Sequence, residues 1–282
     1  MSSSCLSDFF ICNENPSATH TWTLSTRDPN KSPIETLVAY LADKIVEQRF
    51  VDTPHYHEAW KAHHYDGIPV DPKIKKAIIT FLKKPFGLPE DPNSIPVNHL
   101  EGYIGEMLWY FLSMEIGTDE IVYIDPPSFG VTEQGGDGFI IHRMESRYLM
   151  FRIWEVKKFA PSSENTSSHI SGTIRTAFNQ LDERTLEYLA KYTVIGQKFA
   201  DEPEISKFCG EIVDHWIDAS PQAAAGVSVA TSTEHVPTSA FSNFGQRFPG
   251  FTEPVRMKGM ITAIENFSDF AQKVREYVWK GL

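Results

Sequence analysis

The sequence contains few cysteines and no long hydrophobic run. Its three cysteines, Cys5, Cys12 and Cys209, are scattered over 282 residues without a Cys-x-x-Cys spacing. Such a set argues against a disulfide framework and a structural zinc site, and it indicates a reducing, cytoplasmic environment. No run of about 18 apolar residues occurs, so no transmembrane helix is predicted. The first residues are polar and lack a basic stretch, so we expect no secretory signal there.

Positive charge is scarce as well. Lys and Arg number 26 against 37 Asp and Glu, which gives a formal net charge of −11. A protein that binds nucleic acid unaided usually has a basic face, because contacts to phosphates supply most of the non-specific affinity. The charge therefore argues against an independent nucleic-acid-binding protein. The balance differs within residues 142–158, where five basic side chains accompany two acidic ones.

Hydrophobic and aromatic residues, 41% and 12% of the chain, are sufficient for a globular core. Residues 85–97 contain four prolines and predict a linker. We therefore expect a mainly helical N-terminal region, residues 1–95, with one strand at Thr21–Leu24, and a second domain, residues 96–282. In the second domain the patterns predict a helix, three strands, two helices, two strands and a final helix. That order indicates an α/β fold with a mixed central sheet flanked by helices.

The most informative stretch covers residues 135–158, with the sequence GGDGFIIHRMESRYLMFRIWEVKK. Phe139–His142 is a short apolar run, and Tyr148–Trp154 is rich in aromatic and β-branched residues. The two runs predict neighbouring strands joined by a polar turn.

Two carboxylates and a lysine stand at the ends of these strands. Asp137 precedes the first strand, and Glu155 and Lys157 end the second. Because successive strand residues point to opposite faces, Glu155 and Lys157 share a face while Val156 points into the core. If the strands pair as neighbours, Asp137 reaches the same edge. We expect this edge to be solvated, so that substitutions at Glu155 and Lys157 leave folding intact.

Two acids and one amine at one edge suit metal-assisted hydrolysis of a phosphodiester. Mg²⁺ prefers oxygen ligands and usually takes one or two carboxylates together with water and substrate phosphate oxygens. Such a metal polarises the phosphoryl oxygen and lowers the pKa of a bound water. A neighbouring lysine offsets charge that develops on the phosphorus.

At these residues the sequence resembles the PD-(D/E)xK nuclease superfamily. The matching pieces are Gly136-Asp137, Glu155-Val156-Lys157 after an intervening strand, and Gly105-Glu106 on an upstream helix; Gly136 stands where proline is usual. The resemblance implies a restriction-endonuclease-like core of helix, three strands, helix and strand. It also implies a DNA endonuclease that binds Mg²⁺ or Mn²⁺.

The resemblance implies a role for each matching residue. Asp137 and Glu155 would hold the metal, and Lys157 would orient or deprotonate the attacking water. Glu106 would assist as a further metal ligand. Glu101 lies on the opposite flank of the same predicted helix and is the alternative helix acid.

Three further residues are candidates for contacts with nucleic acid. Gln180 falls where many superfamily members place a glutamine that faces the active site. Arg175 on the same predicted helix, and Lys158 beside the catalytic lysine, could contact the phosphate backbone. Each of these side chains could equally be a solvated surface residue.

Within the superfamily, the layout is similar to the nuclease subunit of the Hachiman anti-phage defence system. The similarity lies in chain size, Gly105-Glu106, Asp137-Gly138 and Glu155-Val156-Lys157. It implies a helicase partner that restrains the nuclease, which would account for an acidic chain without its own basic surface. The alternative is a catalytically inactive nuclease-like subunit that serves only in interactions, and the net charge favours it.

Several further patterns in the sequence favour structural roles. Residues 226–230, GVSVA, approach the Gly-x-Ser-x-Gly motif of serine hydrolases around Ser228 but lack the final glycine, and a core strand is favoured. His57 and His63 lack the spacing that places two ligands together on a helix. Asp125, an alternative acidic ligand, precedes a proline and is typical of a turn. Four phenylalanines within residues 241–251 could stack on bases or anchor a loop in the core.

Overall fold

The computed structural model describes residues 5–91, 93–117, 119–128, 137–145, 148–160, 169–237 and 239–282. The strands are β1 (Phe10–Pro16), β2 (Thr21–Arg27), β3 (Glu120–Ile124), β4 (Gly138–Arg143), β5 (Leu149–Lys158), β6 (Ala223–Ser232) and β7 (Met257–Ile264). The helices are α1 (Ile34–Arg49), α2 (Pro54–Asp66), α3 (Pro72–Phe86), α4 (Val97–Ile116), α5 (His169–Tyr192), α6 (Pro203–Ile217), α7 (Phe244–Arg247) and α8 (Phe267–Lys280). None of the helices in these ranges combines the length and apolar character that a membrane span requires.

The described strands form one mixed sheet in the order β1-β2-β7-β6-β5-β4-β3. β3, β4 and β5 are antiparallel neighbours, whereas β5, β6, β7 and β2 run parallel to one another. Parallel neighbours need a long crossover, which α5 and α6 provide between β5 and β6. The α/β class with a mixed, helix-flanked sheet is therefore confirmed. From α4 onward the longer elements follow the predicted order, and the short helix α7 lies between the two strands β6 and β7.

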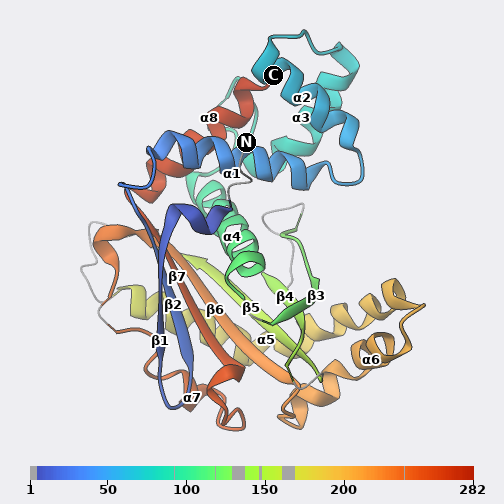
Figure 1. The fold of residues 1–282 in the computed structure, drawn as a ribbon, viewed down its shortest axis with the longest axis vertical. Coiled ribbons are helices and arrows are strands. Elements are labelled where there is room, and N and C mark those ends of the chain that lie inside the picture. Colours follow the sequence, from blue (N-terminus) through green and yellow to red (C-terminus); the bar gives the residue numbers. More distant parts are fainter. Residues whose placement is uncertain are drawn as a thin grey trace.

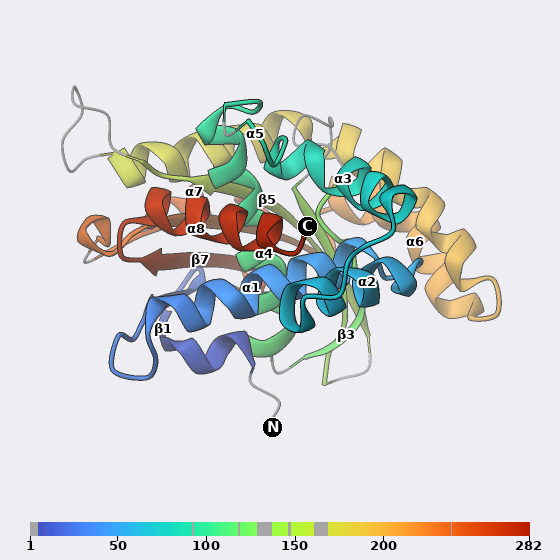
Figure 2. The same ribbon diagram turned by 90° about the horizontal axis from the view of Figure 1, so that it is seen from above.

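The N-terminal region contributes two strands and three helices. β1 and β2 extend the sheet beyond β7. The pattern predicted β2 but missed β1, because most β1 side chains are exposed and show no alternation of apolar and polar residues. α1 lies beside α8 above one end of the sheet (Figure 2). Residues on both sides of the proline-rich segment thus share one sheet and one apolar core.

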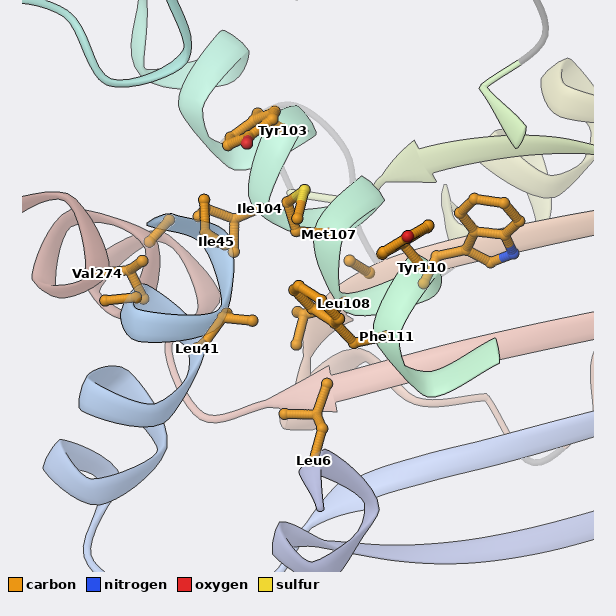
Figure 3. Packing of buried hydrophobic residues seen from close by; sticks show 14 of the residues in the cluster. Leu6, Leu41, Ile45, Tyr103, Ile104, Met107, Leu108, Tyr110, Phe111 and Val274 are labelled. Carbon is orange, nitrogen blue, oxygen red and sulfur yellow. The ribbon is translucent and has the colours of Figure 1, made fainter. Parts of the chain in front are cut away.

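α4 crosses one face of the sheet, and α5 lies behind the other (Figure 1). α4 is apolar around most of its circumference, because it packs against the sheet on one side and against α8 and α3 on the other. A helix with this distribution is stable only when it is buried. Figure 3 shows Ile104 of α4 beside Ile45 of α1, with Leu41 and Val274 in the same core.

A second apolar core fills the α5 face of the sheet. All four phenylalanines between residues 241 and 251 are buried in it. Phe244 stacks on Phe178 of α5 with ring centroids 4.5 Å apart. These rings are loop anchors in the core and present no surface for stacking on bases.

Candidate metal and phosphodiester site

Asp137, Glu155 and Lys157 meet where β4 begins and β5 ends. The antiparallel register of the two strands sets Asp137 opposite Glu155. Lys157 Nζ lies 2.5 Å from Glu155 Oε1 and 3.7 Å from Asp137 Oδ2. Asp137 Oδ2 also accepts a 2.8 Å hydrogen bond from the backbone N–H of Val156. The structure thus brings together the two acids and the amine that the strand pattern placed at one edge.

Glu155 is buried, so the expectation of a solvated edge was wrong for this residue. Its side chain is 1% exposed, whereas Asp137 and Lys157 are 23% and 27% exposed. Helices cover both faces of the sheet, and every residue of β5 up to Val156 is buried. Truncation of Glu155 to alanine would therefore leave a cavity and would remove the nearest carboxylate from the Lys157 ammonium. The isosteric change to glutamine is the appropriate probe.

The charge of Asp137 destabilises that of Glu155, whereas a side-chain hydrogen bond with Glu155 favours the charge of Asp137 and opposes the rise of its pKa. Burial and the negative charge of Asp137 raise the pKa of Glu155 to about 8, although Lys157 opposes the change. Burial also raises the pKa of Asp137, against the attraction of Lys157 and the Val156 N–H. Glu155 Oε2 receives no hydrogen bond from any described residue. Since a buried carboxylate oxygen without a donor is costly, the pair can accommodate a proton or a cation.

Lys157 is the counter-ion of this acidic pair. Burial lowers the pKa of Lys157, but the charges of Asp137 and Glu155 outweigh burial and raise it above its ordinary value. The ammonium is therefore protonated at neutral pH. In this arrangement Lys157 donates hydrogen bonds and supplies positive charge, and it does not serve as a base.

Glu106 approaches the pair from α4. Burial and the charge of Asp137 raise the pKa of Glu106 well above its usual range, and Lys157 and Arg49 partly oppose the shift. Glu101, the alternative helix acid, is buried and forms an ion pair with Lys158. Glu106 is thus the α4 acid within electrostatic reach of the pair, while Glu101 neutralises the lysine that the sequence offered for phosphate contacts.

Arg49, at the end of α1, is a neighbour of the site that the sequence analysis missed. Its guanidinium is buried; Nε donates to Tyr103 Oη at 2.8 Å and Nη2 donates to the Ser128 carbonyl at 2.9 Å. Its charge acts on Glu106, one turn after Tyr103 on α4. An arginine in the last turn of a helix is ordinary in sequence, so only the packing of α1 against α4 reveals this role.

α5 contributes a tyrosine that the sequence also did not indicate. Tyr188 is buried, and its pKa rises to about 12 because of burial and the charge of Glu155. Gln180, Arg184 and Tyr188 follow at four-residue spacing and lie along one side of α5. Gln180 therefore shares a stripe with the tyrosine that faces the acids. Arg175 is exposed on the same helix.

A glycine and two tryptophans position the start of β4. Gly138, directly after Asp137, packs so closely on Trp109 of α4 that an added Cβ would lie 1.9 Å from the indole. Trp109 packs against Trp154 of β5 with ring centroids 5.7 Å apart. Trp154 in turn covers Gly226, its partner on β6. The strand that carries Asp137 can lie against α4 only because residue 138 has no side chain.

The donor set fits a hard cation only in part. Within the described ranges, no group of three His, Cys, Asp or Glu side chains is arranged to hold a metal ion. Asp137 and Glu155 nevertheless provide two carboxylates as possible metal ligands. One buried oxygen of this pair, Glu155 Oε2, accepts no hydrogen bond from a described residue. A Mg²⁺ ion that keeps several waters needs no more than two carboxylates. Gly135 and Gly136 lie outside the described residues.

The remaining sequence candidates take structural positions. Ser228 is buried in the middle of β6, between Val156 and Met260, and not on a strand-to-helix turn. Tyr123 Oη donates to Asp125 Oδ1 at 2.6 Å. His57 is buried on α2, within a region for which no metal-holding group is described.

No model of a known protein family matches the chain, and no curated protein matches it.

The raised pKa of Glu155 predicts a pH-dependent effect on stability. Folding raises this pKa from 4.5 to about 8, so its stabilising contribution is complete below about 4.5 and is lost as the pH rises through 8. Glu155→Gln removes that loss. In metal-free buffer we expect the free energy of unfolding of the variant, relative to that of wild type, to rise by at least about 1 kcal/mol between pH 5 and pH 8. This corresponds to about 3 °C in melting temperature.

The measurement is thermal unfolding with a chelator present at each pH. Glu211→Gln is the matched control, because Glu211 is also paired with a lysine but is exposed on α6. Its difference from wild type should not change with pH. If the melting temperatures of Glu155→Gln and wild type differ by the same amount at pH 5 and pH 8, ionisation of the buried carboxyl group does not destabilise the fold.

Proposed function

We propose that this protein is a metal-dependent nuclease that hydrolyses phosphodiester bonds in DNA. The observation that carries the proposal is the meeting of Asp137, Glu155 and Lys157 at the ends of adjacent strands, with a buried carboxylate oxygen that has no described donor. The order α4, β3, β4, β5, α5 and β6, with α6 inserted between α5 and β6, supports it, because a helix, three strands, a helix and a strand are what the PD-(D/E)xK resemblance implies.

Asp137 and Glu155 would hold Mg²⁺ or Mn²⁺, which supplies polarisation of a phosphoryl oxygen and a water of lowered pKa. Lys157 orients the water through its N–H groups and offsets negative charge that develops on the phosphorus. Glu106 is close enough to influence the charge of the pair, and Arg49 limits the repulsion that Glu106 adds. The Val156 N–H fixes one oxygen of Asp137.

The basic side chains of β4 and β5 offer little free positive charge for holding DNA beside the site. Lys158 is paired with Glu101, Arg143 lies near Glu120 and Glu204, and Arg152 is buried. We infer that a partner supplies part of the DNA contacts. The resemblance to the Hachiman nuclease subunit makes a helicase the expected partner, and anti-phage defence in the cytoplasm the expected role.

The test is incubation of the purified protein with plasmid DNA and Mg²⁺ or Mn²⁺, with and without any co-purifying helicase. We expect metal-dependent nicking or linearisation, which a chelator abolishes. DNA that stays intact under every metal and partner condition would overturn the proposal. Intact DNA would favour the alternative, a catalytically inactive nuclease-like subunit that serves only in interactions, which the net charge of −11 also supports.

A further inference from the structure

A cluster of basic side chains lies on the α4 face of the sheet, away from the acidic pair. His142 of β4, Arg152 of β5 and Lys258 of β7 belong to it. Arg152 pairs with Ile140 and Ala224, and Lys258 pairs with Gly226. Paired residues on neighbouring strands point to the same face of a sheet, and so do residues two apart on one strand. All three side chains therefore lie on the side of the sheet that α4 crosses.

Most of the cluster is buried, and none of its members forms an ion pair with an acidic side chain among the described residues. Arg152 and His142 are 3% and 6% exposed, and Lys258 is partly exposed. Neither Arg152 nor Lys258 forms an ion pair with a described residue. Asp119 acts on Arg152 and Lys258, and Glu14 acts on Lys258, only through longer-range attraction. Two cations in a desolvated position repel each other, and burial together with Arg152 lowers the pKa of Lys258 to about 8.

The cluster also contains N–H donors that lack acceptors. Arg152 Nη1 lies 3.3 Å from His142 Nε2, and Nη2 donates to the Val255 carbonyl at 2.6 Å. Arg152 cannot lose its proton, so His142 Nε2 is the acceptor in this contact and Nδ1 carries the hydrogen. Arg152 Nε and His142 Nδ1 are both buried, and neither has a hydrogen-bond partner among the described residues.

The strand between these donors carries only small residues on this face. β6 carries only Ala224 and Gly226 at the two positions that face the cluster. Trp154 covers Gly226, and its ring lies 5.9 Å from the Arg152 guanidinium carbon. The donors from β5 and β7 are therefore separated by small residues and bounded on one side by an indole.

From these contacts we propose that His142, Arg152 and Lys258 form a binding site for a compact oxyanion with two negative charges, namely a phosphate group. A phosphate offers several acceptor oxygens to a guanidinium, an ammonium and an imidazole N–H. It would neutralise two cations that form no ion pair with a described residue. The site is independent of the proposed nuclease centre, because it lies on the opposite face of β5 from Glu155.

The test measures binding of inorganic phosphate by calorimetry and by thermal unfolding, with a chelator present and ionic strength held constant with chloride. We expect phosphate to raise the melting temperature of the wild-type protein and to bind at one site per chain. Lys258→Gln should weaken binding at least tenfold. This variant should fold, because Lys258 is partly exposed and has no ion pair to lose among the described residues.

Two controls distinguish binding at this site from a general charge effect and from binding at the acidic pair. Lys207→Gln removes a charge of the same sign from a side chain that is 75% exposed on α6, and it should leave phosphate binding unchanged. Glu155→Gln should also retain phosphate binding, whatever its effect on DNA cleavage. Adenosine monophosphate in place of phosphate identifies the source: tighter binding indicates a nucleotide phosphate, and weaker binding indicates the free anion.

Absence of any stabilisation beyond that given by chloride would overturn the proposal. Full retention of phosphate binding by Lys258→Gln would also overturn it. Loss of phosphate binding in Glu155→Gln alone would place the anion at the acidic pair and contradict the assignment.

Discussion

Glu155→Gln is expected to lower metal-dependent DNA cleavage on the order of 10³-fold. The substitution keeps the shape of a side chain that is 1% exposed but removes the charge that would hold the cation. It also leaves Lys157 without its nearest anionic partner. The substitution should lower the rate of cleavage and the affinity for the metal. It should not lower the stability of the fold, because it removes a carboxylate that is buried.

The assay compares initial rates of plasmid cleavage at saturating Mg²⁺ for wild type, Glu155→Gln and the exposed control Glu211→Gln. The control should cleave at the wild-type rate. Lys157→Met should also lose most activity, since its ammonium is the group within 2.5 Å of the Glu155 carboxylate. If Glu155→Gln retains more than about a tenth of wild-type activity, Glu155 does not hold an essential metal.

Gly138→Ala is expected to produce the largest loss of stability, about 2 kcal/mol or more. The new methyl group would lie 1.9 Å from the Trp109 ring. Trp109 is itself fully buried and packed against Trp154, so it cannot move aside at low cost. The start of β4 would shift away from α4, and Asp137 would move with it.

Urea denaturation measures this effect, and Gly210→Ala is the matched control. Gly210 lies on the exposed side of α6, and nothing approaches the position of its missing Cβ. Alanine there should stabilise the protein by about 0.5 to 1 kcal/mol through helix propensity. A Gly138→Ala protein as stable as wild type would show that the contact with Trp109 does not fix the position of β4.

Local patterns in the sequence were sufficient to predict the α/β class and the grouping of the acidic pair with Lys157. Strand alternation placed Glu155 and Lys157 on one face, and pairing of adjacent strands brought Asp137 to them. Both inferences use contacts between chain segments close in sequence. Such contacts depend on periodicity and turn position, which a single sequence carries.

Features that depend on distant segments were not predictable in the same way. The burial of Glu155 results from helices on both faces of β5, and a strand sequence does not show what covers it. Arg49 reaches the site because α1 packs against α4, with Tyr103 more than 50 residues away in sequence as its partner. The phosphate-site candidates His142, Arg152 and Lys258 come from three strands, and only the register aligns them.

Direct measurement of metal binding tests the central proposal most sharply. Mn²⁺ titration followed by electron paramagnetic resonance reports the free ion, and it requires no substrate or partner. We predict one Mn²⁺ site per wild-type chain, with affinity lowered at least tenfold in Asp137→Asn and in Glu155→Gln and unchanged in Glu211→Gln. Equal Mn²⁺ affinity in all four proteins would contradict the assignment of Asp137 and Glu155 as the metal-holding pair.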